Sequence, residues 1–157
     1  MLAKILDRTE VSKVRGFHSG KTVVFTNGCF DLLHAGHVRY LAAARKLGDV
    51  LIVGLNSDAS VRELKGPSRP LNSEEDRAEV LAALEAVDHV VIFGERRASG
   101  LIRELRPDIY AKGGDYTPET LDAEEVAVLK EIGAAIEILP LVRGRSTTRL
   151  LQAIRDR

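Results

Sequence analysis

Apolar residues of the chain gather in five short, nearly continuous runs, and longer segments of mixed polarity separate them. The runs are rich in β-branched residues, which indicates strands buried on both faces. These runs lie at 21–28, 50–58, 89–93, 108–115 and 134–141. The segments between and after them carry helix formers, N-terminal caps and glycine or proline stops, and they predict helices over 37–49, 72–87, 98–106, 122–133 and 146–157.

The strands alternate with the helices, and this order predicts parallel strands covered by helices on both faces. We therefore expect an α/β fold: a Rossmann-like, doubly wound sheet of five parallel strands, in a single domain over residues 1–157. Residues 1–20 are less regular and are expected to form an N-terminal arm or helix. Ligands of such sheets bind beyond the carboxyl ends of the strands. Chemistry is thus expected at 26–37, 56–72, 93–98, 111–118 and 141–147.

The amino-acid composition argues against some classes of binding partner. The 23 basic and 23 acidic residues cancel, which argues against a broad nucleic-acid or membrane-surface role, since both need a net basic face. The single cysteine, Cys29, cannot form an internal disulfide, and this fits a reducing compartment. The N-terminus has no signal-peptide core and no apolar run is long enough to span a bilayer. We expect a cytoplasmic protein without a nucleic-acid or membrane partner.

The stretch "GCFDLLHAGH", residues 28–37, follows the first predicted strand and enters a helix. Gly28 and Gly36 allow a ligand to approach the backbone, and free N–H groups at a helix start attract anions. His34 and His37 beside them can donate hydrogen bonds to phosphate oxygens as charge builds in a transition state. A zinc site of both histidines with Cys29 or Asp31 is disfavoured, because a cysteine ligand favours a sulfur-richer shell. No metal-ligating residue is predicted.

Three further junctions carry candidate ligand groups. In 56–77, polar and basic side chains suit a phosphorylated ligand, although a solvated surface loop also explains them: Asn56, Asp58, Lys65, Arg69 and Arg77. Gly113 permits a close backbone approach and Asp115 can hold a ribose, a sugar hydroxyl or a metal ion, although a plain turn also fits. Gly144 precedes Ser146, Thr147 and Thr148, which form either a second phosphate site at a helix start or a simple N-cap.

With these residues in view, the chain resembles the nucleotidyltransferases with an HxGH signature, and within them the cytidylyltransferase-like group. "GCFDLLHAGH" is similar to the first signature of that superfamily and "GRSTT" to its second. The stretches "LNSDASVRELKGPSRPLN", "LEAVDHVVIF" and "PDIYAKGGDYTPE" resemble the adenylyltransferase half of the bifunctional heptose kinase/adenylyltransferases. The resemblance spans roughly 20–157 and lacks the kinase half, which implies a stand-alone transferase.

The resemblance implies that D-glycero-D-manno-heptose 1-phosphate attacks the α-phosphorus of ATP, giving ADP-heptose and pyrophosphate. It implies catalysis by His34, His37 and Lys65, a nucleotide site with Gly28, Cys29, Phe30, Gly36, Gly113, Gly144, Ser146, Thr147 and Thr148, and a substrate site with Asp31, Asn56, Asp58, Lys65, Arg69, Arg77 and Asp115. The resemblance implies that Arg77 supports either the acidic substrate or the loop. Mg²⁺ accompanies the triphosphate, and a homodimer is expected.

The implied chemistry also agrees with the residues themselves. The nucleophile is already an anionic phosphate, so the site needs positioning and charge stabilisation but no general base. Cys29 stands where the family often has threonine or serine, and no partner base is evident, so no covalent intermediate is expected.

Three alternatives compete with this function. A cytidylyltransferase that uses CTP and glycerol 3-phosphate or another polyol phosphate is the nearest. Leu141 stands where such relatives often carry arginine, with Arg143 and Arg145 nearer the Ser-Thr-Thr run, and this favours the heptose-like group. A non-catalytic nucleotide-binding domain is disfavoured by the intact histidines, Lys65 and hydroxyl run. A flavodoxin-like module is disfavoured because its phosphate loop, after the first strand, is rich in hydroxyl side chains. The corresponding stretch of this chain, "NGCFDLLHAGH", is not.

Overall fold

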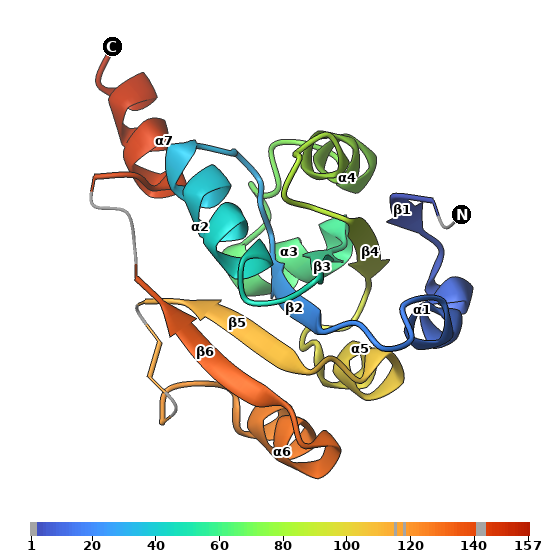
Figure 1. Cartoon of the computed structure of the whole chain (residues 1–157). Helices are drawn as coiled ribbons and strands as arrows, with labels where there is room; N and C mark the ends of the chain where they lie inside the picture. The colour runs from blue at the N-terminus through green and yellow to red at the C-terminus, as the bar shows by residue number, and fades with distance from the viewer. Residues whose placement is uncertain (1–2, 115, 118, 141–143) are drawn as a thin grey trace.

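Six parallel strands form one sheet in the order β1-β4-β3-β2-β5-β6 (Figure 1). The computed structural model describes residues 3–114, 116–117, 119–140 and 144–157. The strands are β1 (Ile5–Leu6), β2 (Val23–Gly28), β3 (Val50–Asn56), β4 (His89–Phe93), β5 (Ile109–Gly113) and β6 (Ala135–Leu139). The helices are η1 (Arg8–Glu10), α1 (Val11–Phe17), α2 (Ala35–Arg45), α3 (Asp58–Lys65), α4 (Glu74–Ala82), α5 (Ser99–Leu105), α6 (Ala123–Ile132) and α7 (Thr147–Arg155).

The predicted parallel α/β architecture is confirmed, but the predicted number of five strands is wrong. The sixth strand, β1, is two residues long and pairs Ile5 and Leu6 with Val90 and Val91 of β4. So short a strand has no hydrophobic periodicity of its own, and it exists because Val90 N–H donates to the Lys4 carbonyl at 2.7 Å. Residues 1–20, predicted as an arm or helix, thus contribute a strand, η1 and α1 within their described part.

Helix α3 was also not predicted, because residues 56–72 were expected to form a loop. Its sequence is mostly polar, and Val61 is its one fully buried large apolar residue. Ser57 caps the start by accepting a hydrogen bond from the Ser60 N–H, and Gly66 ends the helix with a positive φ of 100°. A short helix with such a narrow apolar stripe gives little signal in the hydrophobic pattern.

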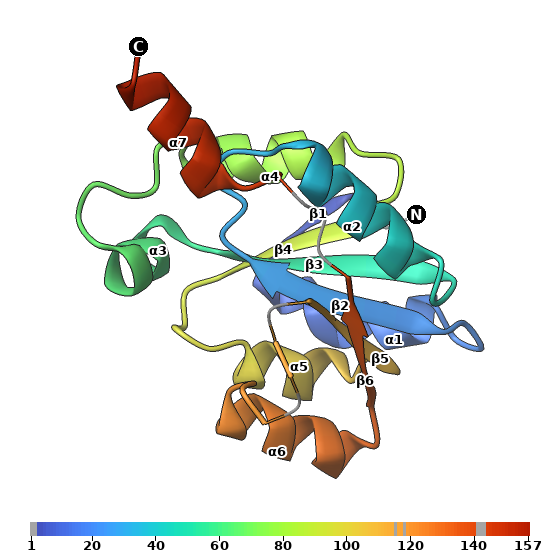
Figure 2. The same ribbon diagram turned by 90° about the vertical axis from the view of Figure 1, so that its left-hand side faces the viewer.

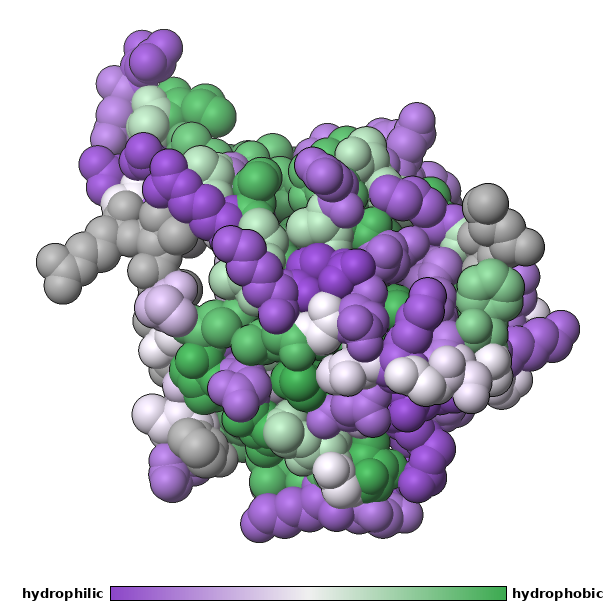
Figure 3. Space-filling model, in the orientation of Figure 1, coloured by the Kyte–Doolittle hydropathy of each residue, from purple (hydrophilic) through white to green (hydrophobic). Residues whose placement is uncertain are grey.

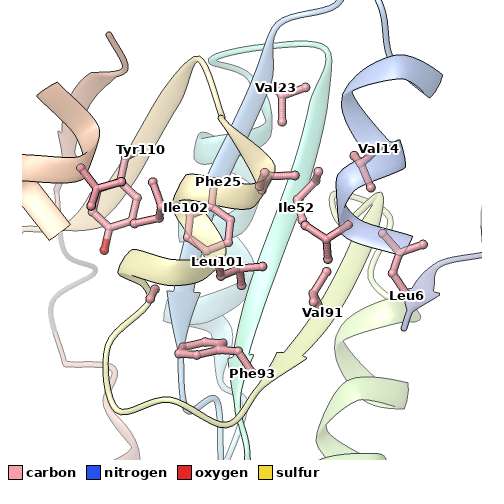
Figure 4. Close-up of a cluster of buried hydrophobic side chains, with 14 of the residues drawn as sticks. Leu6, Val14, Val23, Phe25, Ile52, Val91, Phe93, Leu101, Ile102 and Tyr110 are labelled. Carbon is pink, nitrogen blue, oxygen red and sulfur yellow. The ribbon is translucent and has the colours of Figure 1, made fainter. Parts of the chain in front are cut away.

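Both faces of the sheet are covered, which explains the continuous apolar runs. Figure 2 shows α1, α5 and α6 on one face and α2 and α4 on the other. On the first face Phe25, Ile52 and Tyr110 pack against Leu101 and Ile102 of α5 (Figure 4). On the second face the neighbouring strand residues pack against the apolar sides of α2 and α4: Val24, Leu51, Val53, Leu41, Ala78 and Leu81. Burial of each large side chain contributes about 2 kcal/mol to stability.

The β6 edge of the sheet is less covered. Ala135 and Glu137 of β6 are exposed and its other residues are half-buried. Figure 3 shows a group of hydrophobic residues, with hydrophilic ones among and around it, on the β5–β6 side of the molecule. The described residues include no helix that is both long enough and apolar enough to cross a membrane.

The strand order changes direction at β2. From β2 the chain adds β3 and then β4 on one side, and it later adds β5 and β6 on the other. The connections after β2 and β5 therefore diverge at the carboxyl edge and leave a crevice between them. This crevice is where the fold positions a ligand site.

Candidate active site

The turn between β2 and α2 explains why two histidines stand three residues apart. His34 is the N-cap of α2 with extended backbone, and its Nδ1 accepts a hydrogen bond from the His37 N–H at 3.3 Å. The His37 Nδ1 in return accepts from the His34 N–H at 3.3 Å. This reciprocal arrangement is a capping box made of two imidazoles. The two rings stack with their centroids 3.8 Å apart.

These hydrogen bonds fix the protonation of both rings. A nitrogen that accepts a hydrogen bond carries no proton, so each neutral ring bears its proton on Nε2. Burial lowers the pKa of His37 to about 4, and His34 and Lys65 add to this effect. Burial, followed by the charge of Arg145, also lowers the pKa of His34. At neutral pH the pair therefore presents two neutral Nε2–H donors.

Gly36, between the two histidines, is required by close packing. A Cβ atom at this position would lie 2.8 Å from His34 Nδ1 and 3.0 Å from Cβ of Arg145. Any side chain would displace the stacked rings or the segment that leads into α7. The glycine therefore keeps the histidine pair and the α7 start side by side.

The start of α7 lies against the same turn (Figures 1 and 2). Thr147 Oγ1 donates to the Leu32 carbonyl at 3.0 Å, which joins α7 to the loop before α2. Ser146 Oγ accepts from the Arg149 N–H at 3.0 Å, as a simple N-cap does. Ser146, Thr147 and Thr148 all line the cavity described below. Two helix N-termini thus converge on one place, and both favour an anion there.

Asp31 organises the loop that follows α3. Its carboxylate accepts hydrogen bonds from the Leu71 and Asn72 N–H groups and from Arg69 Nε at 2.8 Å. Burial alone would raise the pKa of Asp31, but the hydrogen bonds from Asn72, Leu71 and Arg69 outweigh it and lower the pKa. Asp31 was predicted to bind substrate, and it also lines the cavity, but both of its carboxylate oxygens are bonded within the protein. It holds the side chain of Arg69 at the cavity wall.

Arg77 lies behind the cavity rather than in it. The residue is 2% exposed, and its guanidinium donates to the carbonyl oxygens of Cys29, Asn56 and Asn72. It also pairs with Asp58 at 2.8 Å. Arg77 therefore ties the ends of β2 and β3 to α4, and its predicted role in supporting the acidic substrate or the loop stays a prediction. Neither Arg77 nor Asp58 is among the cavity-lining residues, and the same is true of Gly144.

The remaining predicted residues meet in one cavity of about 840 Å³ at the carboxyl edge of the sheet. A cavity of this size can hold a nucleotide together with a small phosphorylated acceptor. The predicted residues that line it are Gly28, Cys29, Phe30, Asp31, His34, Gly36, His37, Asn56, Lys65, Arg69, Gly113, Ser146, Thr147 and Thr148. Asp115, Leu141 and Arg143 lie outside the described residues.

Several polar residues of the cavity were not predicted from the sequence. They are Asn27, Tyr40, Arg96, Arg97, Lys112, Tyr116, Asp122 and Glu125. Five of them lie in the junctions 26–37, 93–98 and 111–118, where the rule for parallel sheets could have identified them: Asn27, Arg96, Arg97, Lys112 and Tyr116. Asp122 and Glu125 belong to α6 and its cap, and only the tertiary structure brings them to the cavity.

The charge of the cavity favours anionic ligands. Its acids have partners in the protein: Asp31 pairs with Arg69, Asp122 pairs with Arg97, and Glu125 accepts from the Ala98 N–H. Its basic residues outnumber these acids and are Lys65, Arg69, Arg96, Arg97, Lys112 and Arg145. The excess of cations, with two helix starts, gives a site for phosphate groups.

Comparison with known proteins identifies the same family as the sequence motifs. A family model described as Cytidylyltransferase-like matches residues 25–153. The bifunctional protein HldE of Syntrophotalea carbinolica is 58% identical over 96% of this chain, and that of Trichlorobacter lovleyi is 50% identical over 99%. The chain spans only 30–32% of the length of these two relatives.

Solved structures agree on the fold. The lipopolysaccharide core biosynthesis protein from Thermoplasma volcanium superposes with a TM-score of 0.66 at 28% identity, over 80% of this chain and 100% of that one. A pantoate-beta-alanine ligase from Francisella tularensis superposes with a TM-score of 0.59 over 98% of this chain and 77% of that one. At 14% identity the ligase shares the fold alone.

Proposed function

Because the chain belongs to the cytidylyltransferase-like family, we propose that it is a nucleotidyltransferase that makes ADP-heptose. Its substrates are ATP and D-glycero-D-manno-heptose 1-phosphate, and its second product is pyrophosphate. The observation that carries the proposal is the capped pair of neutral histidines at the start of α2, beside the start of α7 and inside a cavity rich in cations. The similarity of the chain to HldE proteins supports the choice of substrates.

The reaction requires only one displacement at phosphorus. An oxygen of the sugar 1-phosphate forms a bond to the α-phosphorus of ATP, and the bond from that phosphorus to the bridging oxygen of the β-phosphate breaks. Pyrophosphate leaves with the electron pair of this bond. The attacking oxygen carries no proton, so neither histidine has to act as a base, which agrees with their lowered pKa values.

The residues of the cavity then have distinct roles. The Nε2–H groups of His34 and His37 donate to phosphate oxygens and stabilise the charge that spreads during the displacement. Lys65 and Arg69 bring the two anionic substrates together against their mutual repulsion. The N–H groups at the start of α7, with Ser146 and Thr148, bind the β- and γ-phosphates. Gly113 and Gly144 are proposed to lie near the adenine.

A Mg²⁺ ion fits this site as a companion of the triphosphate. In the described part of the chain no group of three or more His, Cys, Asp or Glu side chains is arranged to hold a metal ion. Mg²⁺ commonly keeps several waters and binds through substrate phosphates, so the protein does not need its own cage of ligands. When bound, the ion neutralises phosphate charge. The expected homodimer and cytoplasmic location stay predictions.

The test is pyrophosphate release with a matrix of substrates in the presence of Mg²⁺. ATP and CTP are each paired with heptose 1-phosphate and with glycerol 3-phosphate. Release with ATP and heptose 1-phosphate alone supports the proposal. Release with CTP alone would identify a polyol-phosphate cytidylyltransferase instead. No release from any pair, with ATP binding intact, would contradict catalysis on these acceptors.

A further inference from the structure

Lys112 occupies the point where the strand order changes direction. It is the next-to-last residue of β5, the strand that follows β2 across the sheet. Alternate residues of a strand share a face, so Lys112 follows Tyr110 on the side covered by α5 and α6. Its side chain lines the cavity together with Asn27, the next-to-last residue of β2.

The ammonium group of Lys112 has few strong partners. Its Nζ is 3.5 Å from Asn27 Oδ1, which already accepts a shorter bond of 2.7 Å from the Tyr110 hydroxyl. It lies 4.9 Å from the ring centroid of Tyr116 and 5.8 Å from that of Tyr110. Among the described residues no carboxylate oxygen lies within 4.0 Å of this Nζ. The two rings hold the cation by weak cation–π attraction.

The buried acid that shares this part of the cavity does not pair with Lys112. The Glu125 carboxylate accepts from the Ala98 N–H at 2.9 Å and from the Tyr110 hydroxyl at 3.2 Å. Burial lowers the pKa of Lys112, although the charges of Glu125 and Cys29 oppose this. No carboxylate of the described residues pairs with the Lys112 ammonium, but a phosphate oxygen of a ligand could do so. A charge-assisted hydrogen bond of this kind is strong.

We propose that Lys112 is a further catalytic residue, whose ammonium binds a phosphate oxygen of one of the two substrates. The inference rests on the proposed nucleotidyl transfer, because it needs phosphorylated ligands in this cavity. It adds a cation from β5 to Lys65 of α3 and to the histidines of α2. Groups from β5, on one side of β2 in the sheet, and from α2 and α3, which follow β2 and β3, thus contact the substrates together.

The test compares Lys112→Met, Lys112→Arg and the control Lys130→Met, an exposed lysine on α6. For each, kcat and both KM values are measured with ATP and heptose 1-phosphate, and the binding of each substrate alone is measured by calorimetry. Lys112→Met should lower kcat/KM by about 10- to 100-fold, as the loss of a hydrogen bond to a charged group does. Lys112→Arg should recover part of this loss, and Lys130→Met should match the unmodified protein.

The kinetic constants identify the phosphate that Lys112 contacts. A higher KM and weaker binding for ATP indicate the nucleotide, and the same changes for the sugar phosphate indicate the acceptor. A lower kcat with unchanged binding indicates contact with charge that develops only during the transfer. A lower melting temperature with unchanged kinetics and binding would show a structural role and overturn the inference.

The pH dependence of kcat/KM separates a charged role of Lys112 from a packing role, because a loss of packing alone does not shift it. Since burial lowers the pKa of Lys112, kcat/KM should fall at a pH below the ordinary lysine value of 10.5, and Lys112→Arg should move this fall upward. An unmoved profile would count against Lys112.

Failure of the proposed function is distinguishable from failure of the inference. If the unmodified protein releases no pyrophosphate, the inference is judged on calorimetry alone. Weaker binding of either substrate by Lys112→Met then supports it, and equal binding, or no binding by the unmodified protein, overturns it.

Discussion

The four histidines of the chain form two contacting pairs at opposite ends of the sheet. His34 and His37 lie beyond the carboxyl end of β2, where parallel sheets bind ligands. His89 is the first residue of β4 and contacts His18, which follows α1, at the amino ends of the strands. The residue type is the same in both pairs, so the difference between them lies in what each ring nitrogen bonds.

The pair at the carboxyl end leaves its donors free for a ligand. Both Nδ1 atoms accept from backbone N–H groups, and neither Nε2–H group has a hydrogen-bond partner in the part of the chain that the structure describes. The pair at the amino end uses its donors internally. His89 Nδ1 lies 2.8 Å from the Ala3 carbonyl and must donate to it, so its Nε2 accepts from His18 Nε2 at 2.9 Å. His18 and His89 are each less than a tenth exposed.

In this protein, the histidine pair that can bind a ligand is the one whose rings are oriented by backbone N–H groups and whose Nε2 atoms face the cavity. The pair of His18 and His89 instead attaches the N-terminal segment to β4, since it joins α1, Ala3 and the start of that strand. His18 Nδ1 is buried without a hydrogen-bond partner among the described residues, which costs stability.

The largest expected effect comes from His37→Ala. Removing one of the two Nε2–H donors should lower kcat by about 100-fold or more, as the loss of a charge-stabilising donor does. The melting temperature should change little, since the half of the capping box made by His34 remains. Steady-state pyrophosphate release and thermal unfolding measure the two quantities.

Val38→Ala, on the exposed neighbour of His37, is the matched control and should keep normal kcat. A near-normal kcat in His37→Ala would show that the His37 ring has no catalytic role and that the two histidine pairs do not differ in function.

The reverse result is expected for His89→Ala. This change removes the acceptor for His18, leaves the Ala3 carbonyl unpaired and opens a space at the start of β4. The free energy of unfolding should fall by about 2 kcal/mol, while kcat stays near normal because the cavity lies at the other end of the sheet. Urea denaturation measures the loss. If kcat falls as far as in His37→Ala, the two pairs do not have separate roles.

Stability should also depend on pH through both pairs. Burial lowers the folded-state pKa of His18 and of His37, the latter to about 4, from an ordinary value of 6.5. As the pH falls through 6.5 the unfolded chain takes up protons on these rings before the folded protein does, so stability present above pH 6.5 is lost toward about pH 4. We expect a loss of about 1–2 kcal/mol, after allowance for the partial exposure of His37.

Urea midpoints between about pH 7.5 and 5 measure this loss, a window above the ordinary carboxylate range. His37→Ala and His18→Ala should each flatten the dependence in part. A stability that rises as the pH falls in this window would contradict the lowered pKa values.

The smallest effect is expected for Cys29→Ser, beside the catalytic pair. Burial raises the pKa of the Cys29 thiol, although Lys65, Arg77 and Arg69 oppose this, so the sulfur is no activated nucleophile. Serine fills the same space, and pyrophosphate release should stay within a few-fold of normal. Near-total loss of turnover would indicate a covalent step and a different mechanism at this end of the sheet.

Elements with a local signal can be predicted from the sequence alone. Runs such as 21–28 and 89–93 are buried on both faces, so their apolar pattern predicts strands directly. The histidine turn was equally predictable, because its spacing matches the N-cap and third position of a helix. Ser73 and Ser146 cap α4 and α7 within the predicted ranges for the same reason.

Contacts between residues far apart in the sequence depend on the three-dimensional packing of the chain. β1 forms because β4 offers an edge to pair with, and Arg77 is buried because carbonyl groups from the end of β3 and from the segments after β2 and before α4 converge on it. Lys112 enters the cavity because β5 adds beside β2, and His18 meets His89, 71 residues away, because α1 packs next to the start of β4. The order of strands in a sheet is set by long-range packing, which the local pattern of one chain does not record.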